Sequence, residues 1–309
     1  MVLPILVSRV NPHLQIFIIL VHSRGEEMLN KQQIDQYNNE GFTIFPNFLK
    51  PTQIQKFIEV IETITRGNTL EKHDTSKMEM EPEQEKMGNK VRRLYEPCSY
   101  YPIYQDYAES KGVLDCVELL LGPNIICHYS KLNMKPPKIG SVVEWHQDLS
   151  YSPLTNRDSL AVLLYLDDTN FENGCLKILP KMHKGTLMNH TEDQLFQGRI
   201  TENYNFKGSL DIEGKAGTAI FMNCMTPHAS NMNKSTHTRR TLIVSYRASD
   251  AYPILVRGIG EEAHKFSRLV RGEALEMARF TMDEFPIPKY KGKSASLYQL
   301  QERSKNKTL

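Results

Sequence analysis

Two histidines and one aspartate are the residues best suited to chemistry in this chain. His146 and Asp148 stand two residues apart, and His228 follows far downstream. Side chains two residues apart on a β-strand point to the same face of a sheet. With a histidine from a second strand, they would present two imidazoles and one carboxylate to one side of a metal ion. That ligand set leaves coordination positions open and is typical of non-haem Fe(II) oxygenases.

Each of these residues also has a plain structural interpretation. His146 could be a packed core histidine, His228 a loop histidine, and Asp148 a turn residue bonded to its own backbone. The metal interpretation gains weight because the H-x-D tripeptide stands at the head of a β region and His228 follows another apolar strand. The remaining candidate histidines lack such a pairing, so we expect them to be structural or solvated: His128, His183, His190 and His237.

Arg239 follows His228 by eleven residues, at the start of the apolar run 241–245. An Fe(II) oxygenase needs two electrons beyond those of its substrate, and a 2-oxo acid can supply them by oxidative decarboxylation. A guanidinium holds a carboxylate through two parallel hydrogen bonds, which a lysine cannot imitate. We therefore expect Arg239 to bind the far carboxylate of a 2-oxo acid. Arg240 would point to the other face of the strand as a solvated charge.

Composition indicates an ordinary globular protein. Of the 309 residues, 40% are hydrophobic and 24% charged, and the net charge of +2 gives no case for nucleic acid or an anionic membrane as the main partner. The five cysteines are odd in number and widely spaced, which favours free thiols in the cytoplasm or another reducing compartment. The apolar run 16–21 is too short for a membrane span, which needs roughly 20 residues.

Residues 1–27 are expected to be a loosely attached or disordered N-terminal extension, and residues 28–309 a single domain with a helical C-terminal tail. Helices are expected at 31–38, from Pro51 to Gly67, and over 102–121, and a short strand at 41–45. Residues 68–89, rich in Glu, Lys and Met, are expected to form either a mobile loop beside a site or a solvated linker.

From residue 124 onward the pattern changes to short β-like runs separated by turn residues. Such a series predicts an antiparallel sandwich or barrel. Residues 259–283 are expected to return to helix. The predicted strands are 125–134, 142–148, 160–166, 175–179, 207–213, 217–222 and 241–247.

Most of residues 35–255 resembles the phytanoyl-CoA dioxygenase family of Fe(II)- and 2-oxoglutarate-dependent oxygenases. Beyond the H-x-D tripeptide, His228-Ala229-Ser230 and Arg239 stand at the family's spacing. The remaining matching segments are Glu40-Gly41-Phe42, Gly122-Pro123-Asn124-Ile125, Lys135-Pro136-Pro137, His146-Gln147-Asp148-Leu149, Asn173-Gly174-Cys175-Leu176, Leu179-Pro180 and His183-Lys184-Gly185.

The resemblance implies a mainly β fold with flanking helices around a double-stranded β-helix core, the jelly-roll type also described as cupin-like. It implies Fe(II), 2-oxoglutarate as cosubstrate, O2, and support by ascorbate. Because related halogenases lack the carboxylate that Asp148 supplies, it implies hydroxylation. The implied iron ligands are His146, Asp148 and His228, and the implied cosubstrate residues are Arg239 with its helper Ser230, and by position Lys90, Lys131 and Tyr165.

Other functions stay open at this point. The chain could be a catalytically silent barrel that binds a metal or a 2-oxo acid as a sensor or partner module. It could also be a zinc hydrolase with the same ligands, although no H-E-x-x-H motif accompanies them. The resemblance implies a small-molecule or acyl substrate, and neither the substrate nor the oligomeric state follows from the sequence.

Overall fold

The structure is a computed structural model that describes residues 28–254, 265–290 and 296–305, so the extension predicted for residues 1–27 lies outside it. Two antiparallel sheets make up most of the fold. None of the described helices is both long and apolar enough to cross a membrane.

The strands of the larger sheet are β1 (Phe42–Phe45), β2 (Met78–Met80), β3 (Val91–Tyr95), β4 (Ile125–Lys135), β6 (Ser159–Tyr165), β11 (Ala219–Asn223), β13 (Arg239–Ala248) and β14 (Arg268–Arg271). Those of the smaller sheet are β5 (Val143–His146), β7 (Leu176–Ile178), β10 (Leu210–Ile212) and β12 (His228–Ser230). Neighbouring strands follow the order β1-β11-β6-β13-β4-β3-β2 in the larger sheet, with β14 also paired to β4, and β10-β7-β12-β5 in the smaller sheet. A separate hairpin joins β8 (Thr191–Glu192) and β9 (Leu195–Phe196).

The helices are α1 (Lys31–Glu40), α2 (Pro51–Thr65), α3 (Pro97–Tyr100), α4 (Pro102–Ala108), α5 (Lys111–Leu121) and α7 (Leu297–Lys305), with a 3₁₀ turn, η1, at Asp148–Ser150. Helix α1 is bounded on both sides by local chemistry. Asn30 and Gln33 form a reciprocal capping box at its start, and Gly41 adopts a positive φ at its end.

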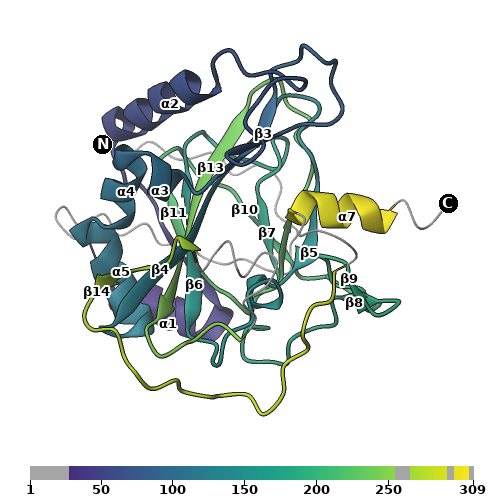
Figure 1. The fold of residues 1–309 in the computed structure, drawn as a ribbon. Coiled ribbons are helices and arrows are strands. Elements are labelled where there is room, and N and C mark those ends of the chain that lie inside the picture. Colours follow the sequence, from purple (N-terminus) through teal and green to yellow (C-terminus); the bar gives the residue numbers. More distant parts are fainter. Residues whose placement is uncertain (1–27, 255–264, 291–295, 306–309) are drawn as a thin grey trace.

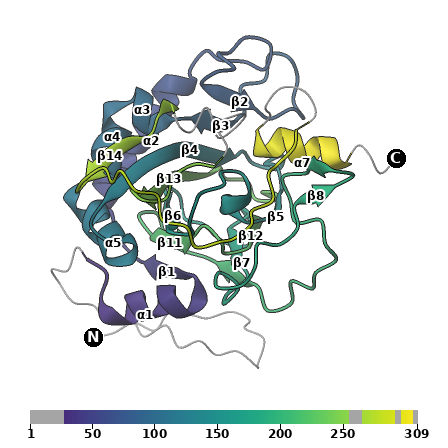
Figure 2. The same ribbon diagram turned by 60° about the horizontal axis from the view of Figure 1, so that its bottom comes forward.

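Helices α2 to α5 cover one face of the larger sheet, and the smaller sheet lies on the other side (Figures 1 and 2). Alternate residues of each strand therefore serve two different interiors. Leu132 and Val244 belong to the core beneath the helices. Leu163 and Ile243 face the smaller sheet, where they pack with residues such as Ile178.

The register of the larger sheet determines which polar residues point toward the smaller sheet, on the side that we call the inner face. Arg239 is paired with Lys135 across β13 and β4, and Ile243 with Lys131. Across β4 and β3, Asn133 is paired with Arg93. Directly opposed residues point to the same side of a sheet, so these side chains all face the smaller sheet beside the apolar pairs.

The mainly β fold with flanking helices is confirmed, and so are the strands expected from residue 124 onward, apart from their ends. Three expectations are wrong. Residues 102–121 form two helices, α4 and α5, rather than one. Residues 68–89 contain strand β2, whose three residues are all buried. The described part of 259–283 contains strand β14 instead of a continuing helix, while residues 259–264 lie outside the described ranges.

The larger sheet explains the unexpected strand. Strand β4 is long, and β3 pairs with it only near Lys131 to Asn133. Strand β14 pairs with the same edge of β4 further along, at Ile125 to Cys127. Residues 268–271 therefore form hydrogen bonds with backbone groups of β4 that β3 does not reach. This pairing with β4 outweighs any local preference of the segment for helix.

Candidate metal centre

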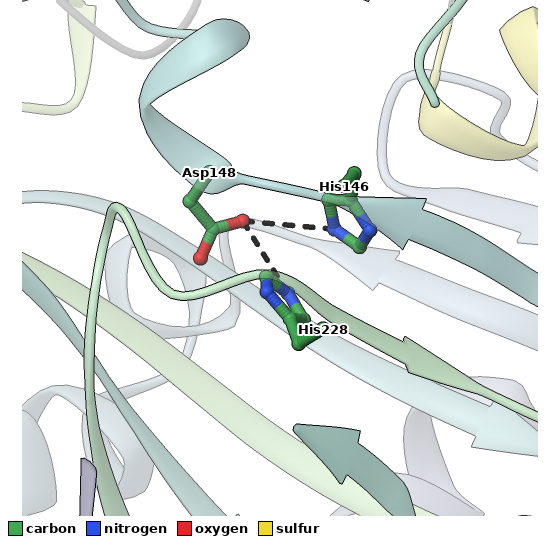
Figure 3. Close-up of side chains that lie close together, drawn as sticks. All are labelled: His146, Asp148 and His228. Atoms are coloured by element: carbon green, nitrogen blue, oxygen red, sulfur yellow. Dashed lines mark ion pairs between the residues drawn. The ribbon is translucent and has the colours of Figure 1, made fainter. Parts of the chain in front are cut away.

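The two histidines meet because their strands pair. In the smaller sheet, β12 lies antiparallel to β5 with His228 directly opposite His146, and the register then shifts at a bulge. Their ring centroids are 4.0 Å apart. The Nε2 atoms of both histidines lie 3.8 Å from Oδ1 of Asp148 (Figure 3). One ligand atom from each residue falls within 4.8 Å of the others, a spacing suited to one shared metal ion.

Asp148 reaches this point from a turn rather than from the expected strand. His146 is the last residue of β5, and Asp148 opens the 3₁₀ turn η1. Gln147 between them keeps an extended backbone, with φ −120° and ψ 131°, so Asp148 still emerges on the side of His146. As expected, the Gln147 side chain points away, donating to the carbonyl of Met225 and accepting from the N–H of Met188.

Backbone carbonyls fix the tautomer of both histidines. Nδ1 of His146 lies 2.8 Å from the carbonyl of Glu144, and Nδ1 of His228 lies 3.0 Å from that of Thr226. Because a carbonyl only accepts, each Nδ1 carries the proton and each Nε2 offers a lone pair toward Asp148. Burial lowers the pKa of both imidazoles, which favours the neutral form that binds metals.

Arg239 is buried at the start of β13. Its Nη1 donates to the Thr241 hydroxyl at 3.0 Å and its Nη2 donates to the carbonyl of Gly174. Its Nε is buried and has no hydrogen-bond partner in the described chain, and none of the described carboxylates forms an ion pair with it. Burial lowers the pKa of this guanidinium. The arrangement leaves the cation ready for an incoming carboxylate.

Arg240 is not the solvated charge that we expected. It forms an ion pair with Asp167, whose carboxylate accepts from its Nε at 2.9 Å and from its backbone N–H at 2.7 Å. Both side chains are only 17% exposed. The two successive arginines therefore differ in their partners. Arg240 is paired with the carboxylate of Asp167, whereas Arg239 donates only to a neutral hydroxyl and a neutral carbonyl.

The other predicted cosubstrate residues are spread over different surroundings. Ser230 is buried on β12, two residues beyond His228. Lys131 is partly buried on the inner face of β4. Tyr165 is buried, with its hydroxyl donating to the carbonyl of Ile212 at 2.7 Å. Lys90 lies at the surface, just before β3, and is exposed. The structure therefore brings Lys131 and Ser230 toward the centre, and not Lys90.

Three of the remaining histidines have the structural or solvated character that we expected. His190 is buried and accepts from the backbone N–H of Gln147 through Nε2. Burial lowers its pKa to about 4. His183 is paired with the carbonyl of Asn38, and His237 is exposed.

Two residues near the centre were not predicted as site residues: His128, which was expected to be structural or solvated, and Arg93. His128 lines a small polar cavity together with Asp148, Ser152 and Ser245. Arg93 is buried on the inner face of β3, opposite Asn133. Strand alternation could have placed Arg93 on that face once its partner strand was known, but a five-residue strand with charges at successive positions gives no such signal by itself.

The five cysteines of the chain, Cys98, Cys116, Cys127, Cys175 and Cys224, are all free and buried, which confirms the expectation of free thiols.

The chain matches the family model for phytanoyl-CoA dioxygenase (PhyH) over residues 37–241. It is 31% identical to a probable alpha-ketoglutarate-dependent hypophosphite dioxygenase of Stutzerimonas stutzeri, covering 83% of this chain and 90% of the relative. It is 29% identical to human peroxisomal phytanoyl-CoA dioxygenase, covering 79% of each chain.

Solved structures support the same fold. The crystal structure of EctD from S. alaskensis with 2-oxoglutarate and 5-hydroxyectoine superimposes with a TM-score of 0.59 at 21% identity, covering 72% of this chain and 77% of that one. The same enzyme with bound Fe gives a TM-score of 0.61 at 19% identity, covering 73% and 79%. Together with the His-Asp-His centre, these matches identify the chain as a member of the phytanoyl-CoA dioxygenase family of Fe(II)- and 2-oxoglutarate-dependent dioxygenases.

Proposed function

We propose that the protein hydroxylates a C–H bond of a small molecule, with Fe(II) held by His146, Asp148 and His228. The convergence of these three ligand atoms carries the proposal. The overall reaction would convert substrate, O2 and 2-oxoglutarate into hydroxylated substrate, succinate and carbon dioxide. When bound, Fe(II) and 2-oxoglutarate supply the oxidising chemistry, and the protein supplies binding and orientation.

The residues present fit a ferrous ion. Two neutral imidazoles and one carboxylate make up the facial ligand set that iron oxygenases use. Both imidazoles are already oriented by their Nδ1 hydrogen bonds to backbone carbonyls, so little ordering remains for metal binding. The Asp148 side chain is 25% exposed, which leaves a route for ligands from outside.

Arg239 is the residue we assign to the 5-carboxylate of 2-oxoglutarate. Its guanidinium is buried and paired only with neutral oxygens, and a dianionic cosubstrate would provide the missing charge. Thr241 holds one nitrogen of the fork, so the orientation is set before binding. Ser230 and Tyr165 are assigned as further walls of the cosubstrate pocket, whereas Lys131, whose ammonium has no acidic partner among the described residues, is not assigned to 2-oxoglutarate. Lys90 is exposed just before β3, so it would reach this pocket only after that segment moved toward the iron ligands.

The names of the relatives favour a small-molecule substrate without selecting one. They include enzymes of phytanoyl-CoA, ectoine, hypophosphite and methylphosphonate. We further propose that residues 28–309 act as one domain and that the enzyme works in a reducing intracellular compartment. The free state of all five cysteines supports the second point.

The proposal is tested by measuring succinate from purified protein with 2-oxoglutarate, O2 and either Fe(II) with ascorbate or Zn(II). Iron-dependent succinate release, even without substrate, is the expected result. Hydrolytic activity restored by zinc alone would overturn the oxygenase assignment. Stoichiometric binding of iron and 2-oxoglutarate with no decarboxylation, coupled or uncoupled, would instead identify a binding module.

A further inference from the structure

A buried guanidinium lies on the inner face without an acidic partner of its own. Arg93 is 2% exposed. Its Nε donates to the side-chain oxygen of Asn133 at 3.0 Å. Its Nη2 is buried and has no hydrogen-bond partner in the described part of the chain. Because an unpaired buried charge is costly to desolvate, buried cations are normally paired. Arg93 therefore has unused capacity for an anionic acceptor.

The acid that acts electrostatically on Arg93 is already occupied. Glu79 accepts from Arg92 Nη2 at 2.8 Å, from the Tyr95 hydroxyl at 2.9 Å and from the Ser296 hydroxyl at 2.8 Å. Within the described ranges, no carboxylate forms an ion pair with Arg93. The contrast with Arg92 is direct, since that neighbour is paired with both Glu79 and Glu302.

A second cation stands beside Arg93 on the same face. In the β3–β4 pair, Arg93 is opposite Asn133 and Tyr95 is opposite Lys131, so Arg93 and Lys131 are diagonal neighbours. The Lys131 ammonium lies 5.6 Å from the ring centroid of Tyr129. It makes neither a hydrogen bond nor an ion pair with any described residue.

Lys131 also connects this pair to the candidate metal centre. Burial lowers the pKa of Lys131, the charge of Asp148 opposes that shift, and Arg93 adds to it. The ammonium therefore lies within electrostatic range of Asp148 and of Arg93 at once.

Aromatic rings hold the guanidinium in place. The Arg93 guanidinium carbon lies 4.7 Å from the ring centroid of Tyr298 on α7 and 5.9 Å from that of Tyr95. Stacked rings restrict a guanidinium while leaving its edge free to donate. Such a preorganised fork matches a planar carboxylate or a tetrahedral phosphorus oxyanion.

We propose that Arg93 and Lys131 bind the anionic group of the substrate, which is a small oxyanion of the carboxylate or phosphorus-oxyanion class. The inference rests on the proposed function, because it takes Arg239 and the iron as the partners of the two carboxylates of 2-oxoglutarate. With those carboxylates accounted for, Arg93 and Lys131 are cations that the cosubstrate leaves unmatched. A substrate anion satisfies both.

The test is calorimetric titration of the anaerobic protein loaded with Fe(II) and 2-oxoglutarate. The probes are hypophosphite, methylphosphonate and propionate, with neutral propionamide as the comparison. We expect at least one oxyanion to bind and propionamide not to bind. Arg93→Met should weaken oxyanion binding tenfold or more, and Arg93→Lys should recover part of it. Arg66→Met, which removes an exposed arginine, is the matched control and should bind like the wild type.

Other outcomes would overturn the inference. These are equal binding of propionate and propionamide, no oxyanion binding by the wild type, or Arg93→Met weakening 2-oxoglutarate as much as the oxyanions. The last result would assign Arg93 to the cosubstrate. Lys131→Met provides a second variant in case Arg93→Met does not fold, and it should also weaken the oxyanion. Iron-dependent succinate release by the wild type, measured in parallel, shows whether the proposed function survives if the anion site fails.

Discussion

The two faces of the larger sheet differ in character although the same strands build both. On the face covered by helices, Leu132 and Val244 pack into a continuous apolar core. On the inner face, their neighbours Lys131 and Ser245 lie beside the candidate metal centre or its small polar cavity. Because successive side chains of a strand point to opposite faces, they contribute in turn to the apolar core and to the surroundings of the candidate site. Substitutions on the helix face should change the free energy of unfolding, and those on the inner side should change turnover.

The largest effect is expected at the metal ligands. Asp148→Ala should lower succinate formation at least about 1,000-fold and reduce iron bound per chain, because it removes the only carboxylate of the ligand set. The melting temperature of the metal-free protein should change little, since this side chain is 25% exposed and forms no hydrogen bond with any residue that the structure describes. Glu192→Ala, at the surface, is the control. Full activity of Asp148→Ala would refute the ligand assignment.

On the helix face, Leu132→Ala should act on stability alone. Leu132 is fully buried in the core beneath the helices, while its sequence neighbours Lys131 and Asn133 point to the inner face. Removing its side chain should cost about 2–5 kcal/mol of unfolding free energy, as for other buried leucines. Denaturant unfolding measures this loss, and activity per folded molecule should stay within about twofold of the wild type. A loss of activity larger than the loss of folded protein would show that the faces are not independent.

The successive arginines of β13 sharpen the comparison. Arg239→Met should raise the KM for 2-oxoglutarate about 100-fold, and Arg239→Lys should raise it about tenfold, because lysine cannot form the two-pronged contact. Arg240→Met removes an ion pair with Asp167 on the other face and should cost about 1 kcal/mol of stability. Steady-state kinetics distinguishes them. Equal KM values for both methionine variants would disprove the assigned role of Arg239.

A further effect depends on pH and comes from the helix face. Burial raises the pKa of Glu96 to about 8, against 4.5 in the unfolded chain. The folded state therefore retains a proton that the unfolded state releases. The resulting stability is fully present below pH 4.5 and is lost as pH rises toward 8.

Glu96→Gln should remove this dependence. Relative to the wild type, the variant should gain on the order of 4 kcal/mol of unfolding free energy between pH 5 and pH 8.5. Denaturant titrations at both pH values measure the difference, with the exposed Glu83→Gln as control. An unchanged pH dependence would mean that Glu96 is ionised in the folded protein.

Sequence alone was sufficient for the parts of the fold that depend on local pattern. Apolar spacing located α2, and strand-like runs located β4, β6, β11 and β13. The H-x-D tripeptide and the following histidine were also sufficient to predict a common centre. They did not show how the centre forms, because the pairing of His228 with His146 is a non-local register that only the folded sheet determines.

The errors share one physical cause, which is that tertiary contacts decide short elements. Strand β2 has only three residues in a Glu- and Lys-rich stretch, and its pairing with β3 buries Met78 and Met80. Strand β14 forms because β4 has an open edge. Arg93 could not be predicted as a site residue for the same reason, because its orientation toward the inner face follows from its pairing with Asn133 on β4.

The contact of the C-terminal helix with the smaller sheet has a practical consequence. Strand β5 is the last strand of that sheet, so one of its edges has no further strand. Gln301 of α7 accepts from the backbone N–H of Glu144 on β5 and donates to the carbonyl of Gly198. A chain shortened before residue 297 would uncover this edge to strand addition by other molecules. Aggregation during expression is therefore the hazard to expect from C-terminal truncation.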